Sequence, residues 1–196
     1  SIYPVFDVIK GSGADGTFTY PDDDPDYAGS LHEWRVDRDS VIIGMGGHLH
    51  PGGLTVDLAA RRDGATPTNP EAEGDTVPVF TSEAVYFEPA GAVSWDVSMT
   101  VAPPEYRVAV QEGDVLSLST TYDTERASWY ESMGIMVVFL VDGDDGVDPF
   151  SEPVTYRRVL SHGHLPENDN RGGQVVEYPD SREKAASDLF DVQDEP

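Results

Sequence analysis

Clusters of glycine, proline and aspartate interrupt this chain so often that only short apolar runs remain between them. These runs are rich in Val, Tyr, Thr and Ile, and several alternate apolar with polar residues, as a half-buried strand does. They cover residues 3–9, 34–43, 54–60, 77–87, 94–101, 106–110, 115–122 and 135–141. Many short strands at this spacing predict an all-β fold, an antiparallel β-sandwich or jelly roll.

The composition changes near Asp142, where Gly, Asp, Asn and Pro become more frequent. We therefore predict a β-sandwich domain over residues 1–148 and a loop-rich C-terminal arm over residues 149–196 that wraps around it. A short helix is expected at Ser181–Phe190, with Ser181 as its N-cap and Glu183 in its acidic first turn. The length of 196 residues is sufficient for one domain with a substantial core.

Charge and composition exclude several classes of function. The chain has 37 acidic against 12 basic residues and a net charge of −25, so no basic surface for nucleic acid is available. It contains no cysteine, which excludes disulfides, thiolate zinc sites and cysteine nucleophiles. No apolar run approaches the roughly 18 residues of a membrane span. The chain opens at Ser1, which is compatible with processing, and we expect an extracellular or cell-surface protein.

Four of the five histidines form two His-x-His pairs, His48-Leu-His50 and His162-Gly-His164. Residues i and i+2 of a strand point to the same face, so each pair offers two imidazoles to one point. Neutral imidazole is a common ligand of copper, zinc, iron and nickel. Both pairs are therefore predicted metal ligands; the alternative is that each is an exposed polar face or a hydrogen-bonded loop.

Met133 and Met136 lie at the start of the apolar stretch ESMGIMVVFLV, residues 131–141. Methionine on a strand usually fills the core. Beside two histidines of a neighbouring strand, however, a thioether is a soft third ligand, which favours copper over zinc. Copper is therefore the predicted cofactor, with zinc as the alternative.

The segments 46–58 (GGHLHPGGLTVDL), 112–122 (EGDVLSLSTTY) and 132–141 (SMGIMVVFLV) together resemble a known family. They are similar, in order and spacing, to the C-terminal domain of the copper type II ascorbate-dependent monooxygenases, the peptidylglycine alpha-hydroxylating and dopamine beta-hydroxylating enzymes. Other stretches, such as SHGHLPENDNRGG, resemble a secreted bacterial variant of this domain, in which a third histidine stands where this chain has Arg171.

The resemblance implies that His48, His50 and Met133 bind the catalytic copper, with Met136 as a second choice for the thioether. His162 and His164 would complete this site or form a second one. The family uses two coppers in two domains, whereas this chain supplies one sandwich. The resemblance thus implies a copper site more strongly than a reaction.

Three functions follow as hypotheses. The first is a secreted copper-binding domain for retention, delivery or electron transfer, with the metal ion and a redox partner or further domains as its partners. The second is an ascorbate- and oxygen-dependent copper monooxygenase domain. The third is a structural or adhesive sandwich without metal.

Two further groups have a functional and a structural interpretation. Asp142, Asp144 and Asp148 alternate with glycines as in a calcium loop, although a solvated acidic turn is the simpler reading. Trp129 and Tyr130, just ahead of Met133, belong to the core or support a metal from behind its ligands.

Overall fold

The chain folds as an antiparallel β-sandwich. The computed structural model describes residues 4–24, 32–86, 91–93, 95 and 97–161, together with the strand positions 176–177. Its strands are β1 (Val5–Val8), β2 (Thr17–Tyr20), β3 (Glu33–Arg35), β4 (Ser40–Leu49), β5 (Gly53–Arg61), β6 (Thr76–Tyr86), β7 (Val97–Val101), β8 (Val108–Val110), β9 (Val115–Asp123), β10 (Trp129–Asp142), β11 (Val159–Leu160) and β12 (Val176–Glu177). A single turn of 3-10 helix covers Gly91–Val93. The all-β prediction is confirmed.

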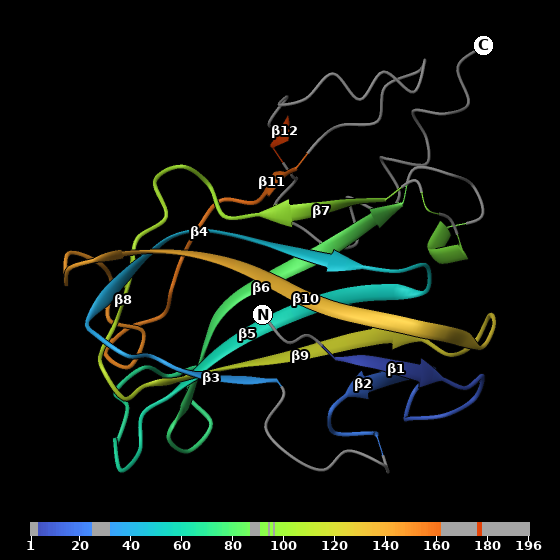
Figure 1. Cartoon of the computed structure of the whole chain (residues 1–196), viewed down its shortest axis with the longest axis horizontal. Coiled ribbons are helices and arrows are strands. Elements are labelled where there is room, and N and C mark those ends of the chain that lie inside the picture. Colours follow the sequence, from blue (N-terminus) through green and yellow to red (C-terminus); the bar gives the residue numbers. More distant parts are fainter. Residues whose placement is uncertain are drawn as a thin grey trace.

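The strands form one continuous hydrogen-bonded order, β1-β10-β4-β7-β6-β5-β9-β2, which folds over into two layers. The first layer is built on the long pair β10 and β4, which run side by side in Figure 1. The second layer is built on β6, β5 and β9. Strand β7 joins the two layers because it pairs with β4 at one point and with β6 over three residues.

Alternation of apolar and polar residues determines which face each strand buries. In β5, Val56, Leu58 and Ala60 are at most 5% exposed, whereas the residues between them are only partly covered. In an antiparallel sheet this period of two turns one face to the core and leaves the other to solvent. The two layers enclose two apolar clusters, one around Ile42 and Phe80 and the other around Phe6 and Tyr122.

The strand boundaries differ from the sequence-based expectation in several places. Strand β4 runs on to Leu49, six residues beyond the predicted end, and the two-residue strands β11 and β12 were not predicted. The run predicted over 34–43 is two strands, since β3 ends at Arg35 and β4 begins at Ser40. Strand β2 was not predicted. Strand β10 begins at Trp129, six residues before the apolar run that predicted it. The helix expected at Ser181–Phe190 lies outside the described residues.

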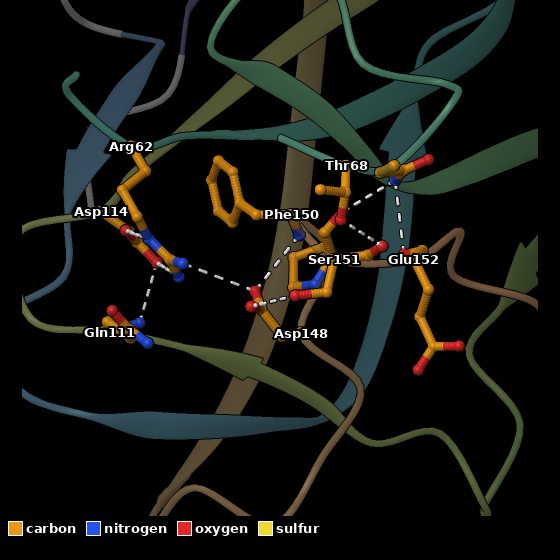
Figure 2. Close-up of polar contacts among 10 residues, drawn as sticks. Arg62, Thr68, Gln111, Asp114, Asp148, Phe150, Ser151 and Glu152 are labelled. Atoms are coloured by element: carbon orange, nitrogen blue, oxygen red, sulfur yellow. Dashed lines mark hydrogen bonds and ion pairs between the residues drawn. The ribbon is translucent and has the colours of Figure 1, made fainter. Parts of the chain in front are cut away.

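The segment after β10 is fastened to the sandwich through Arg62, whose guanidinium is itself held by a buried ion pair with Asp114. Arg62 donates two hydrogen bonds to the carboxylate of Asp114, at 2.8 and 3.0 Å, and Asp114 is 1% exposed. The same guanidinium stacks on the ring of Phe150, 4.1 Å from its centroid, and lies 3.6 Å from the carboxylate of Asp148 (Figure 2). Phe150 itself is part of the core. Further along, Val159 pairs with Val101, so β11 extends the sheet beyond β7.

Within the described part of the chain, no helix has the length and apolar character needed to cross a membrane.

Candidate metal centre

The first His-x-His pair lies at the end of β4, with both imidazoles on the outer face of the sheet. Leu49, between them, is 2% exposed and packs in the core, so the alternation of β4 turns His48 and His50 outward. His48 is exposed and His50 is half-buried. Their rings are 5.4 Å apart between centroids and nearly perpendicular, at 89°. The prediction that these two imidazoles share one face of a strand agrees with this placement.

The register of β10 against β4 brings a methionine beside this pair. His48 is opposite Ile135 and Leu49 is opposite Gly134. The ladder ends there, so His50 and Met133 are the first residues beyond it. Ile135 projects to the same face as its partner His48, and Met133, two residues before Ile135 on β10, lies on that same outer face. Met133 is partly exposed, and on its other side it pairs with Val5.

The remaining methionines belong to the interior. Met136 packs against both core clusters, and Met45 and Met99 are 4% and 7% exposed within them. Met136 therefore faces away from the histidines, as expected for a residue three positions from Met133 on a regular strand.

A buried tyrosine of the opposite layer links the two ligand strands. The hydroxyl of Tyr122, on β9, accepts a hydrogen bond from the backbone N–H of His50 at 3.1 Å and donates one to the carbonyl of Met133 at 2.6 Å. Tyr122 is 0% exposed, and burial raises its pKa to about 12, so the hydroxyl keeps its proton at neutral pH. One oxygen thus holds the backbones of both candidate ligands at the point where the ladder ends.

Replacing Tyr122 by phenylalanine tests this link. The Tyr122→Phe variant loses the acceptor of the His50 N–H and the donor to Met133, which costs about 1–3 kcal/mol when the partners stay buried. We expect copper affinity, measured by competition with a chromophoric chelator, to fall in Tyr122→Phe. The fall should be present even well below the melting temperature of the variant, where the chain is folded. A matched change, Tyr106→Phe, removes a buried hydroxyl that donates to Val79 in the other core cluster, and it should leave copper affinity unchanged.

The environment of His48 favours its neutral form. Partial burial lowers the pKa of His48, and the neighbouring imidazole of His50 lowers it further. A neutral imidazole presents a free nitrogen lone pair to a metal ion. Desolvation and the neighbouring imidazole thus both favour the neutral form of His48.

The outer face of β10 beside the centre is apolar. Val137, Phe139 and Val141 are 48%, 61% and 45% exposed, and residues 132–141 contain no charged side chain. The carboxylates of β10 belong to Glu131 and Asp142, which flank this apolar run. The candidate donors are the imidazoles of His48 and His50 and the thioether of Met133.

An exposed tryptophan also reaches the pair. Trp95 precedes β7, is 68% exposed, and lies with its ring centroid 5.0 Å from that of His50, tilted by 58°. The sequence-based interpretation did not include Trp95, since nothing in the local pattern around it distinguishes it from a surface aromatic residue.

His162 and His164 lie outside the described residues. The last described residue before them is Ser161, which directly follows β11 and donates its N–H to the carbonyl of Met99 at 2.8 Å. Ser161 thus lies beside β7, one residue before the second His-x-His pair in the sequence.

Ser161 lies at the same end of the sheet as the first His-x-His pair. Val101 of β7 pairs with Gly46 on one side and with Val159 on the other, so β4 and β11 run in the same direction. His48 is two residues beyond Gly46, and Ser161 is two residues beyond Val159. Two strand spacings separate them, about 10 Å or more since β4 and β7 diverge there.

The residues present fit a soft metal better than a hard one. Among the described residues, no group of three or more His, Asp or Glu side chains could hold a metal ion. Met133 would add a thioether to the two imidazoles, and a thioether suits Cu(I) but is a poor ligand for zinc or calcium. The chemistry of this donor set agrees with copper.

The acidic turn after β10 is arranged differently. The carboxylate of Asp148 accepts hydrogen bonds from Ser151 Oγ at 2.8 Å and from the N–H of Phe150 at 3.2 Å, in addition to its ion pair with Arg62 (Figure 2). Asp142 lies 3.7 Å from the guanidinium of Arg38. The structure thus does not gather Asp142, Asp144 and Asp148 into a cation-binding group.

The aromatic pair ahead of Met133 divides between interior and surface. The indole N–H of Trp129 donates to the carbonyl of Asp123 at 2.6 Å, and its ring lies where a side chain on Gly52 would be, 2.4 Å from an ideal Cβ position. Gly52 has a φ of +90°, which favours glycine. Trp129 therefore fixes the turn after His50, while Tyr130 is 67% exposed.

Comparisons with protein-family models, with curated proteins and with solved structures found no match to this chain.

Proposed function

We propose that this protein is a copper-binding domain that holds the metal through His48, His50 and Met133, for retention or delivery. The observation that carries the proposal is the register at the end of β4, which puts two outward imidazoles beside the thioether strand. The link through Tyr122 supports it, because the link fixes the spacing of both strands without a metal. When bound, copper would supply a redox-active or transferable ion at the sheet surface.

His162 and His164 are proposed as further ligands of the same ion. The support is topological: the chain leaves β11 at Ser161, about two strand spacings from His48, with one residue step to His162. Additional imidazoles would strengthen copper retention, since they would fill coordination positions that three ligands leave open.

A matched pair of methionine variants tests the thioether. In Met133→Leu the sulfur is lost from the outer face, and Cu(I) affinity is expected to fall about 10- to 100-fold, in the range for loss of supporting groups in metal sites. Zinc affinity should change little, because a thioether contributes little to zinc. Competition titrations with a Cu(I) chelator and a zinc chelator give both numbers.

The control is Met136→Leu, which makes a similar change in volume at a core position facing the other way. We expect it to keep Cu(I) affinity and to cost less than about 1.5 kcal/mol of stability. Equal Cu(I) affinities for Met133→Leu and the unmodified chain would remove Met133 from the site and leave a site of imidazoles alone.

The second candidate function is copper-dependent oxygen chemistry. The observation in its favour is that His48 is exposed and that, within the part of the chain that the structure describes, no group of three or more His, Asp or Glu side chains encloses it. A copper ion held there would keep a coordination position open to a small molecule. Oxygen uptake by the copper-loaded protein with ascorbate as electron donor tests this function. Uptake that disappears in His48→Ala would support it, and no uptake by a chain with its copper bound would reject it.

A further inference from the structure

Trp95 is an exposed indole that rests on a candidate metal ligand. Its side chain is 68% exposed, the largest exposed fraction given for a large hydrophobic residue among the described residues. The ring contacts the imidazole of His50, with centroids 5.0 Å apart and planes tilted by 58°. Such exposure of a large apolar ring has no evident benefit for stability.

The other two tryptophans have a visible part in the fold. Trp129 donates a hydrogen bond to Asp123 and packs over Gly52. Trp34 lies on β3, where its backbone pairs with Leu116 of β9. Trp95 belongs to neither core cluster, and its recorded ring contact is with His50.

The face of an indole attracts a cation placed within about 6 Å of its centre. A metal held by the ring nitrogens of His48 and His50 would be close to this indole, whose centroid lies 5.0 Å from that of the His50 ring. This environment suits Cu(I), a singly charged soft ion that is satisfied by two or three ligands. It offers little to Zn²⁺, which needs four N, O or S donors and here would keep water.

We infer that Trp95 is part of the metal site, where its indole face stabilises bound Cu(I) and favours Cu(I) over Zn²⁺. This role of Trp95 rests on the proposed copper-binding function. It adds the oxidation state of the bound copper and a residue that favours Cu(I) over Zn²⁺. The contribution of one partly exposed cation–π contact corresponds to about a 2- to 30-fold gain in affinity.

The test compares the unmodified chain with Trp95→Phe and Trp95→Leu. Affinities for Cu(I) and for Zn²⁺ are measured separately by chelator competition, and tryptophan fluorescence is recorded during the Cu(I) titration. We expect Cu(I) affinity to decrease from Trp to Phe to Leu, with about 2- to 30-fold between the ends, while zinc affinity stays constant. Copper should quench part of the emission of the unmodified chain, and this quenching should be absent from both variants.

Trp34→Phe is the matched control, since it removes a half-exposed indole on β3, in the other layer. It should keep both the Cu(I) affinity and the quenching. Equal Cu(I) affinities for Trp95→Leu and the unmodified chain would overturn the role of Trp95 and leave copper binding intact. A parallel loss of Cu(I) and Zn²⁺ affinity would overturn the selectivity. An unmodified chain that binds no copper would overturn the proposed function and this inference together.

Discussion

The His48→Ala/His50→Ala variant is expected to lose nearly all affinity for copper while keeping its fold. Each imidazole removed should cost about 100-fold in affinity, judged from the roughly 10–16 kcal/mol that four ligands give a structural zinc site. Both side chains point outward, whereas Leu49 between them fills the core. Their loss should therefore leave the melting temperature of the metal-free chain nearly unchanged.

Copper competition titrations and thermal melts of the two chains, each prepared free of metal, measure this result. His32→Ala is the control, because it removes one imidazole from a residue just ahead of β3, in the other layer of the sandwich. It should keep the copper affinity of the unmodified chain. Copper binding that survives the double substitution undiminished would place the site elsewhere in the chain.

Asp114→Ala is expected to lower the stability of the folded chain more than most single substitutions in the described part of the molecule. Asp114 is 1% exposed and accepts two hydrogen bonds from Arg62 and one, at 2.8 Å, from the N–H of Gln111 (Figure 2). Removing its carboxylate leaves the guanidinium partly buried without its main partner. Breaking a buried pair in this way costs about 3–5 kcal/mol, which corresponds to a melting temperature lower by about 6–20 °C in a chain of this size.

Thermal unfolding followed by circular dichroism measures the effect, and Asp37→Ala is the control. Asp37 forms an ion pair with Arg38, with 68% and 62% of the two side chains exposed, so water screens it and its loss should hardly change the melting temperature. Because Asp114 lies at the opposite end of β5 from the His50 turn, Asp114→Ala should keep its copper affinity below its melting temperature. Equal melting temperatures for the two variants would contradict the anchoring role of Arg62 and Asp114.

The sequence predicted the strands best where a full run alternates between core and solvent. Residues 54–60 do so, and they became β5 nearly unchanged. Strand β2 has only four residues and is stabilised by its pairing with β9, a partner about one hundred residues away, which local pattern does not reveal. Strand β10 extends back to Trp129 because β1 pairs with its first residues, and this too depends on distant chain.

For the candidate site, the period of two on a strand was sufficient to place His48 and His50 on one face, and the same period separated Met133 from Met136. The bridge made by the Tyr122 hydroxyl and the contact of Trp95 with His50 could not be predicted. Both arise where strands distant in sequence meet, and neither residue belongs to a recognisable spacing. Short-range pattern thus indicated His48 and His50 as candidate ligands, the resemblance added Met133, and the three-dimensional register brought Tyr122 and Trp95 beside them.

An anomalous difference map, collected at the copper absorption edge from crystals grown with copper, tests the central claim most directly. We expect one strong peak bonded to imidazole nitrogens of His48 and His50 and to the sulfur of Met133, at the end of β4. A copper peak away from both His-x-His pairs, or no peak above background, would contradict it.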